Sequence, residues 1–405
     1  MPSKTKNKFF LVVVLTIGLV IGGINLISAS SSEAKELTNR KIVVFNKNLD
    51  ETKRGALLAK FKILSFKNLD LINAKVMMLS AQMEKDLLDQ PEVLRIDEDV
   101  VVEALFLNKI LARLAPAPTP VVSTQVLPWG VDRIDADLVW KTTTGDPIRV
   151  AVLDTGIDTA HPDLKDNLKG GINTITYIKG YNDDNGHGTH VAGIIAALNN
   201  TVGVVGVGPK IDLYAIKALD GQGSGYLSDI IEGLDWAIQN KMQVVNMSLG
   251  TTVDVLSFKE AVQRANAAGI VQVVAAGNNG GAVNYPAAYS EVIAVSAIDK
   301  TNTIASWSSR GVEVDLAAPG VDIYSTYKGK IYKTLSGTSM AAPHVSGVVA
   351  LLLSVPQKCD TDLNGVCSPA EIQQRLKATA KDLGAVGSDN LYGAGLVDAG
   401  KAVLQ

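Results

Sequence analysis

The chain has 405 residues, of which 47% are hydrophobic and 20% are charged, a balance typical of a globular protein with a large buried core. Lys+Arg number 38 and Asp+Glu 41, giving a formal charge of −3, which excludes a nucleic-acid-binding protein that relies on bulk positive charge. Two cysteines exclude a disulfide-dense scaffold and a four-cysteine zinc site.

The N-terminus carries the pattern of an export signal. Three lysines within the first eight residues precede an apolar run over residues 9–27, and small residues follow at 28–30. This order is typical of a signal peptide, which we assign to residues 1–34. The run is nearly long enough to span a bilayer, so a retained N-terminal membrane anchor is the alternative. Either segment places the remaining chain outside the cytoplasm.

Residues 36–105 predict a small α+β domain in which helices cover one face of a sheet. The segments that predict strands are 41–46, 75–79, 93–96 and 100–104, and those that predict helices are 50–60 and 81–90. A proline-rich stretch, LAPAPTP at 114–120, marks residues 106–124 as a stiff linker to the next domain.

Residues 125–405 predict an α/β domain with a doubly wound, mostly parallel sheet. Its apolar runs are continuous rather than alternating, which is typical of strands buried on both faces: 148–153, 212–219, 244–247, 271–276 and 292–297. Helical segments lie between or after them at 227–240, 257–268 and 339–354. In such a fold, ligands bind beyond the carboxyl ends of the strands.

Three motifs stand at the strand ends and helix starts of this domain. DTGID at 154–158 follows a strand, NGHGTHVAG at 185–193 opens a helix, and GTSMAAPH at 337–344 places a hydroxyl at the start of another helix. An aspartate, a histidine and a serine are the orienting group, base and nucleophile of acyl transfer. Taken singly, the aspartate is compatible with a turn residue and the serine with a helix N-cap. The two histidines could be metal ligands, but no carboxylate or cysteine accompanies them at ligand spacing.

The three motifs, in the order Asp, His, Ser, resemble those of the subtilisin family of serine endopeptidases, and the order distinguishes them from other serine hydrolases. The resemblance extends from Gln125 to the C-terminus and includes LYGAGLVD at 391–398. The first block resembles the subtilisin propeptide, a ferredoxin-like domain, and RIDEDVVVEAL at 95–105 is similar to its closing segment. The resemblance implies a zymogen that processes itself, with a first cut near Leu105. Because residues 106–124 are extra length before Gln125, we also predict a second trim near the proline-rich linker.

The resemblance also implies a role for each catalytic residue. Ser339 attacks the scissile carbonyl, His190 takes and returns the proton, and Asp154 orients the imidazole. The side-chain amide of Asn278 donates to the oxyanion, beside the backbone N–H of Ser339. On this assignment, His187 is a structural neighbour, and His344 is packed or hydrogen-bonded inside the serine helix.

Protein and peptide substrates are expected to pair as an extended strand with two edge segments, which favours broad specificity because edge pairing reads backbone atoms. The residues that this resemblance assigns to substrate binding are Gly223, Ser224, Gly225, Ser248, Leu249, Gly250, Ala275, Ala276, Gly277 and Asn284. Asn284 is expected at the base of the primary pocket. No acidic cluster appears in the pocket segments, so large apolar or aromatic residues are expected before the cut.

A first structural calcium site is implied by a loop very similar to the tight calcium loop of the family. Oxygen ligands of this kind suit a hard cation. The ligands implied are Gln125, Asp163, Leu198, Asn200, Val202 and Val204.

A second calcium loop is predicted from the pattern D-x-D-x-[DN]-G-x₅-E, with Asp360, Asp362, Asn364, Val366 and Glu371 as ligands. Ser368 and Glu371 equally fit a capping box for the following helix, without any metal. The two interpretations are compatible. Cys359 and Cys367 flank the loop and are expected to form a disulfide in an oxidising compartment.

Two other functions are weighed against a secreted, broadly specific protease. One is a membrane-tethered processing protease of narrow specificity, and the other is a catalytically silent scaffold that binds peptides. We expect a monomer whose partners are its substrates and its own propeptide as an intramolecular inhibitor, with no nucleic acid.

Overall fold

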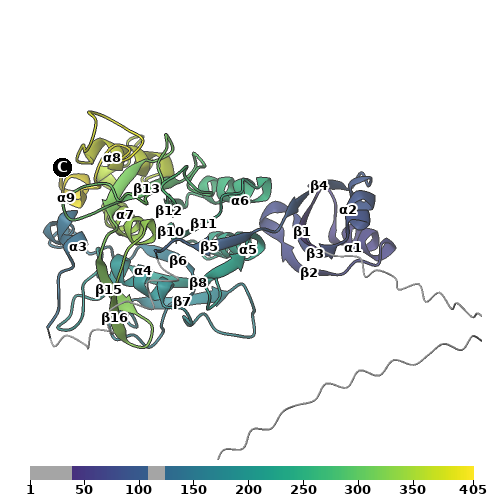
Figure 1. Cartoon of the computed structure of the whole chain (residues 1–405), viewed down its shortest axis with the longest axis horizontal. Helices are drawn as coiled ribbons and strands as arrows, with labels where there is room; N and C mark the ends of the chain where they lie inside the picture. Colours follow the sequence, from purple (N-terminus) through teal and green to yellow (C-terminus); the bar gives the residue numbers. More distant parts are fainter. Residues whose placement is uncertain (1–38, 108–123) are drawn as a thin grey trace, which may run out of the picture. The chain divides into compact units, whose positions relative to one another are not determined.

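The computed structural model describes residues 39–107 and 124–405 (Figure 1). The predicted signal or anchor at 1–34 and nearly all of the predicted linker at 106–124 lie outside the described residues. Among the helices of the described part, none is both long and apolar enough to cross a membrane.

The first domain is a four-stranded antiparallel sheet in the order β2-β3-β1-β4. Its elements, in the ferredoxin-like order, are β1 (Asn39–Phe45), α1 (Glu51–Lys60), β2 (Ser65–Leu69), β3 (Ala74–Leu79), α2 (Ala81–Leu88) and β4 (Val93–Glu98). Val43 and Phe45 pack against helices α1 and α2 on one face, as predicted. Ile42 and Val44 point to the other face, because side chains alternate along a strand.

Strand β5 (Val101–Ala104) does not close this sheet, although the sequence predicts it as the domain's last strand. It pairs antiparallel with β9 (Ser224–Tyr226) and β11 (Leu249–Gly250) in a separate sheet of the order β11-β5-β9. The physical reason is that two free edges of the second domain satisfy both rows of its backbone hydrogen-bonding groups.

The second domain contains a seven-stranded sheet in the order β14-β13-β12-β10-β6-β8-β7, and all its strand pairs are parallel. This confirms the predicted α/β class. The strands are β6 (Arg149–Asp154), β7 (Leu168–Asn173), β8 (Asp212–Lys217), β10 (Val244–Met247), β12 (Val271–Ala275), β13 (Ile293–Ile298) and β14 (Leu316–Pro319).

Helices cover both faces of the sheet (Figure 1). Val150 and Val152 of β6 belong to a core with α4 (His187–Ala196) and α7 (Thr338–Leu353), whereas Ala151 and Leu153 belong to a core with α5 (Leu227–Gln239) and α6 (Leu256–Ala267). The second core also contains Ile42 and Val44, so the first domain rests on α5 and α6. The remaining elements are α3 (Trp129–Arg133), the hairpin β15 (Ile323–Tyr327) and β16 (Ile331–Leu335), α8 (Pro369–Thr379) and α9 (Ala399–Leu404).

Candidate active site

The end of the first domain lies between the two edge segments that the sequence assigns to substrate binding. Strand β5 pairs with both, and the pairing continues to its end. Ala104 N donates to Gly223 O at 2.9 Å, and Leu105 N donates to Ser248 O at 3.1 Å. The chain's own residues 101–105 therefore pair with the two edge segments as an extended substrate peptide would.

The carbonyl oxygen of Leu105 receives two hydrogen bonds. Asn278 Nδ2 donates to it at 2.6 Å, and Ser339 N donates at 3.3 Å. The amide of Asn278 is oriented by Thr338, whose N–H and hydroxyl both donate to Asn278 Oδ1 at 2.9 Å. A Cβ on Gly337 would lie 2.8 Å from Leu105 O, so a glycine is required there. Two convergent donors would stabilise negative charge on this oxygen.

A buried carboxylate–imidazole pair lies at the end of β6. Asp154 is the last residue of this strand, and His187 is the first residue of α4. Their side chains approach to 2.7 Å between Asp154 Oδ1 and His187 Nδ1, and both are at most 1% exposed. The other ring nitrogen, His187 Nε2, has no hydrogen-bond partner, and the Phe106 ring lies 4.9 Å from the imidazole, centroid to centroid.

The prediction that His190 is the base is wrong, as is the structural role predicted for His187. His190 Nε2 lies 3.1 Å from Ile323 O and 2.9 Å from Lys333 O, both in the β15–β16 hairpin. Burial lowers the pKa of His190 to about 3, so this imidazole stays neutral at working pH. An imidazole that makes no bond to Asp154 and whose Nε2 faces two backbone carbonyl oxygens is not placed for proton transfer. His187, and not His190, makes the contact with Asp154 that a base of this kind requires.

Ser339 is the second residue of α7 and is fully buried beneath the β5–Leu105 segment. Its Oγ donates to Ser248 O at 3.0 Å, so the hydroxyl is not bonded to His187 in this structure. Catalytic hydrogen bonds of this kind often form only when the reacting geometry is reached. His344, farther along α7, bonds Met340 O through Nδ1 at 2.7 Å and is packed, as the sequence predicts.

One residue of the predicted pocket, Gly250, lies against the Leu105 side chain. A Cβ built on Gly250 would lie 3.1 Å from Leu105 Cδ1 and 3.2 Å from Asn284 Cβ. Asn284 is 8% exposed and also lies beside Gly277, where an added Cβ would come within 3.0 Å of its Cγ. Ala275 and Ala276, at the end of β12, are fully buried. Gly250, Gly277 and Asn284 of the predicted pocket therefore lie close together.

Comparison with known families matches residues 145–395 to Peptidase_S8, the subtilase family. The chain belongs to the subtilase family. The thermostable alkaline protease of Halalkalibacterium halodurans is 46% identical over 334 residues, which are 80% of this chain and 89% of that protein. Subtilisin Savinase of Lederbergia lenta is 48% identical over 277 residues, 68% of this chain and 98% of that protein. This subtilase is accordingly a serine protease, a hydrolase of peptide bonds.

The residues predicted to form the first calcium site of this subtilase come together. Gln125 Nε2 lies 2.8 Å from Leu198 O and 3.2 Å from Val204 O. Asn200 Nδ2 lies 2.7 Å from Asp163 Oδ1. Asp163 is fully buried, and its Oδ2 accepts from the Tyr332 hydroxyl at 2.8 Å and from Val204 N at 3.0 Å. A buried carboxylate beside side-chain amides and backbone carbonyls is a set of oxygen ligands that suits a hard cation.

The second predicted loop brings Asp360, Asp362 and Glu371 together, with one oxygen of each within 4.8 Å of the others. Gly365 has φ of +92°, which suits the sharp turn of such a loop. The capping box also forms, because Ser368 Oγ accepts from Glu371 N while Glu371 Oε2 accepts from Ser368 N. Hydrogen bonds from Thr361 and Ser368 lower the pKa of Glu371 to about 2. Both interpretations of the loop therefore stay compatible.

The expected disulfide is present. Cys359 and Cys367 are bonded to each other and enclose the loop.

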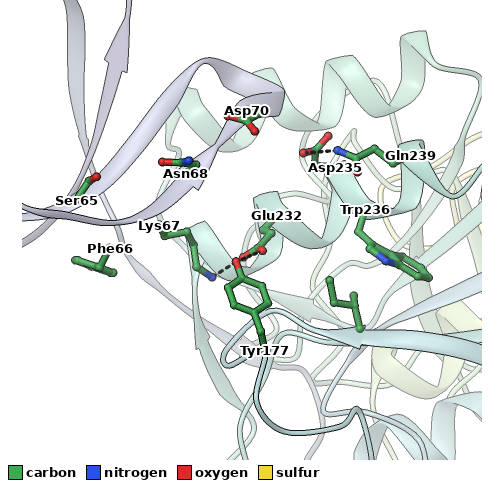
Figure 2. A pocket seen from close by; sticks show the side chains of 11 residues that line it. Ser65, Phe66, Lys67, Asn68, Asp70, Tyr177, Glu232, Asp235, Trp236 and Gln239 are labelled. Carbon is green, nitrogen blue, oxygen red and sulfur yellow. Dashed lines mark hydrogen bonds and ion pairs between the residues drawn. The ribbon is translucent and has the colours of Figure 1, made fainter. Parts of the chain in front are cut away.

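A polar pocket of about 470 Å³ lies where β2 meets α5 (Figure 2). Lys67 Nζ reaches from β2 to the carboxylates of Asp229 and, at 2.7 Å, Glu232. It also donates to Thr174 O at 2.6 Å. The Tyr177 hydroxyl bonds Glu232 from the opposite wall. These side chains join the first domain to the second through a largely desolvated ion pair.

Two carboxylates of the first domain also cap helices of the second. Asp99 Oδ1 accepts from Ser228 N at 2.8 Å at the start of α5, and Asp97 Oδ2 accepts from Ser257 N at 3.1 Å at the start of α6. Negative charge is favourable at a helix N-terminus, where backbone N–H groups lack partners. The first domain thus satisfies groups that would otherwise face solvent.

Sequence reasoning missed some residues of the site. Phe106, against His187, was not singled out, and neither was Asp183, which is buried beside the start of α4. The placement of Phe106 follows directly from the predicted cut near Leu105. Asp183 stands four residues before His187 in the same glycine-containing loop, which is a usable signal for a capping carboxylate.

Proposed function

We propose that this subtilase is synthesised as a zymogen that hydrolyses its own Leu105–Phe106 bond and then acts as a broadly specific serine endopeptidase. The observation that carries the proposal is the Leu105 carbonyl, held between Asn278 Nδ2 and Ser339 N. In this reaction Ser339 is the nucleophile, His187 the base and Asp154 the residue that orients the imidazole.

The reaction begins when the Ser339 hydroxyl leaves Ser248 O by rotation about its Cα–Cβ bond. Its oxygen attacks the Leu105 carbonyl carbon, and His187 Nε2 accepts the proton. The resulting oxyanion is stabilised by Asn278 Nδ2 and Ser339 N. The imidazolium, held by Asp154, donates the proton to the Phe106 nitrogen, and the C–N bond breaks. Water then enters and attacks the acyl carbonyl carbon while His187 removes its proton. The ester bond to Ser339 Oγ breaks, and His187 returns the proton to that oxygen.

After the cut, the first domain remains bound as an inhibitor. Its hold does not depend on the broken bond, because β5 still pairs with both edges and Asp97 and Asp99 still cap α6 and α5. The Lys67 ion pair adds a contact that water reaches poorly. Lasting activity therefore requires destruction of the first domain.

Specificity rests mainly on backbone pairing, with one side-chain pocket. Leu105 fills that pocket against Gly250, and this supports a preference for large apolar residues before the cut. The paired carboxylate and imidazole and the two donors argue against a silent scaffold.

The signal-peptide pattern at the N-terminus supports an extracellular location for the mature enzyme. The membrane tether and the monomeric state stay predictions from the sequence.

The site of the first cut is open to a direct test. The wild-type chain is expected to yield a product that begins at Phe106, read by N-terminal sequencing. Leu105→Asp would place an unpaired carboxylate in an apolar pocket and is expected to slow the cut by about 10²-fold or more. Val101→Asp, at a half-exposed position of β5, is the matched control and is expected to cut at nearly the wild-type rate. Equal rates for Leu105→Asp and the wild type would refute the assignment.

We further propose that calcium binds the first loop through Gln125, Asp163, Leu198, Asn200, Val202 and Val204. For this, the side-chain amides of Gln125 and Asn200 would turn by 180° about their last side-chain bond, so that their oxygens face the ion. Bound calcium would hold the loop against the first residues of the domain. We also propose the loop at 360–371 as a weaker, more exposed site.

Calcium removal is expected to lower the melting temperature of the Ser339→Ala chain, used to avoid self-digestion. At 100 times the dissociation constant, binding is worth about 2.7 kcal/mol, equivalent to about 5–10 °C for a domain of this size. Scanning calorimetry with calcium and with chelator measures the shift, and magnesium is the control ion. Asp163→Asn is expected to remove most of this shift in melting temperature.

Asp360→Asn tests the loop at 360–371. If the chain still bound the same number of calcium ions after this change, the proposed second calcium site would be excluded.

A further inference from the structure

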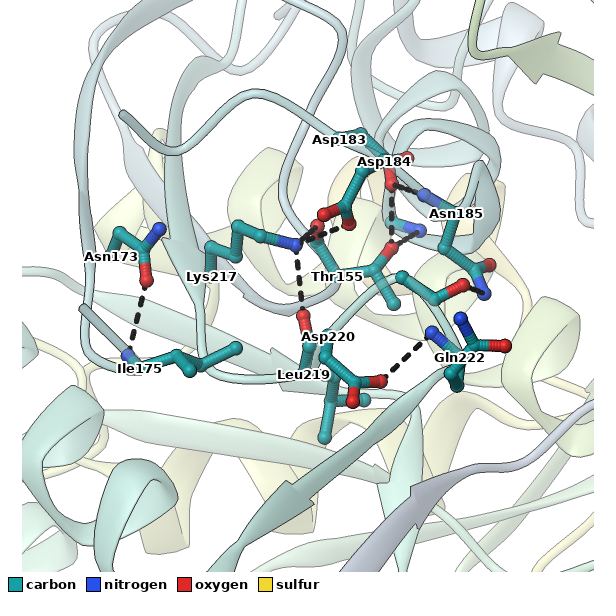
Figure 3. A network of polar contacts seen from close by, with 12 residues as sticks. Thr155, Asn173, Ile175, Asp183, Asp184, Asn185, Lys217, Leu219, Asp220 and Gln222 are labelled. Carbon is teal, nitrogen blue, oxygen red and sulfur yellow. Dashed lines mark hydrogen bonds and ion pairs between the residues drawn. The ribbon is translucent and has the colours of Figure 1, made fainter. Parts of the chain in front are cut away.

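The carboxylate of Asp183 lies between the two elements that carry the carboxylate–imidazole pair (Figure 3). It belongs to the loop between β7 and α4 and is 4% exposed. Oδ1 accepts from Thr155 Oγ1 at 2.9 Å, Asn185 N at 2.9 Å and Gly186 N at 2.8 Å. Oδ2 accepts from Thr189 N at 3.0 Å and Thr189 Oγ1 at 2.6 Å. Five donors thus converge on one buried carboxylate.

The start of α4 depends on these contacts. Its N-cap is Gly186, which has no side chain to satisfy the free N–H groups of the first turn. Those groups bond side chains outside the helix: His187 N to Asn185 Oδ1, Gly188 N to Thr155 Oγ1, and Thr189 N to Asp183 Oδ2. The direction in which the helix presents His187 is therefore set by residues of two preceding loops.

The end of β6 is held by the same network. Thr155 follows Asp154, and its N–H donates to Asp154 Oδ1 at 2.7 Å while its hydroxyl bonds Asp183. The carbonyl of Thr155 is held as well, because Lys217 Nζ at the end of β8 donates to Thr155 O at 2.8 Å (Figure 3). The same ammonium group pairs with the Asp184 carboxylate at 2.6 Å. Thr155 is thereby fixed through its N–H, its hydroxyl and its carbonyl.

We infer that Asp183 is a positioning residue, which locks Asp154 and His187 into reacting geometry by binding the end of β6 and the start of α4 at once. It touches neither substrate nor reacting atoms. Catalytic groups must be held within a few tenths of an ångström, and a displacement of 1 Å can cost about 10²-fold in rate. The inference deepens the proposed function and rests on it.

The kinetic test uses the first-order self-cleavage of the full chain, followed by intact mass. Asp183→Asn keeps the size of the side chain, but whichever way the amide turns, its NH₂ meets donors that need an acceptor. We expect a rate about 10- to 100-fold below the wild type. Thr155→Val is expected to act similarly, Thr155→Ser to restore the rate, and the double variant Asp183→Asn with Thr155→Val to be little slower than either.

Asp315→Asn is the matched control. Asp315 is also a buried carboxylate, and it accepts from Ala294 N at 2.9 Å and pairs with Lys377, outside the site. This change is expected to lower the melting temperature but to leave the self-cleavage rate within about twofold, because the cost of a lost buried hydrogen bond is one of stability. A loss of the same size as for Asp183→Asn would overturn the inference.

A readout independent of activity comes from the low-field proton resonance of the Asp154–His187 hydrogen bond, recorded in the Ser339→Ala chain. Addition of Asp183→Asn or Thr155→Val is expected to shift or broaden this resonance, and addition of Asp315→Asn to leave it unchanged. An unchanged resonance with either of the first two in a folded chain would overturn the inference. A wild-type chain that never cuts itself would instead contradict the proposed function, and the resonance would still decide the role of Asp183.

Discussion

A chain with Ser339→Ala is expected to stay whole while the wild-type chain divides at Leu105–Phe106. The change removes the hydroxyl that we propose as the nucleophile, whereas Asn278 and the backbone pairing continue to hold the peptide. In subtilisin itself, loss of the serine costs on the order of 10⁶-fold in kcat, and we expect a loss of that size here. Intact mass over several days, with calcium present, measures both chains.

Ser346→Ala is the matched control for this experiment. Ser346 is a buried serine of the same helix, and its Oγ donates to Asn246 Oδ1 at 2.8 Å, outside the reaction path. This variant is expected to process itself at close to the wild-type rate. If purified Ser339→Ala chains divided as fast as the wild type, the assignment of the nucleophile would be wrong.

Replacing the two histidines of α4 separately is expected to give results that differ by several orders of magnitude. His187→Ala removes the imidazole bonded to Asp154 and is expected to slow self-cleavage on the order of 10⁶-fold, again the size of the loss in subtilisin. His190→Gln keeps a donor toward Ile323 O and Lys333 O, so we expect a rate within about tenfold of the wild type and a moderate loss of stability. Self-cleavage and thermal unfolding of both variants provide the measurements.

One outcome of this comparison would contradict the assignment of His187 as the base. If His190→Gln, while folded at the assay temperature, abolished cleavage and His187→Ala did not, the original sequence-based assignment would be restored. Thermal unfolding is needed because His190 joins α4 to the β15–β16 hairpin, and an unfolded variant would also be inactive.

Several features were predictable because they depend on local sequence. Continuous apolar runs predicted β6, β8, β10, β12 and β13, since strands covered on both faces have no polar side to alternate with. The positions of Asp154 at a strand end and of Ser339 at a helix start were predictable because each stands within a long motif. The disulfide between Cys359 and Cys367 was predictable because the two cysteines are eight positions apart and flank a polar loop.

Other features depended on partners far away in the chain. The 100–104 segment was predicted as a strand, but its partners lie at β9 and β11, more than 100 residues further along. The ion pair of Lys67 with Asp229 and Glu232 is equally distant in sequence. No spacing rule connects such residues, because the docking of one domain on another brings them together.

The choice between His187 and His190 is one that the sequence alone did not decide correctly. The sequence motifs determined the family resemblance and the reaction class, and they predicted the order of the catalytic types and a first cut near Leu105. His187 and His190 are three residues apart in one helix, so their side chains leave its axis in directions about 60° apart. Which of them meets Asp154 depends on the direction of α4 relative to β6, and Asp183, Thr155 and the β15–β16 hairpin set that direction. Only the tertiary structure could decide it, because packing contacts rather than local spacing fix the rotation of a helix.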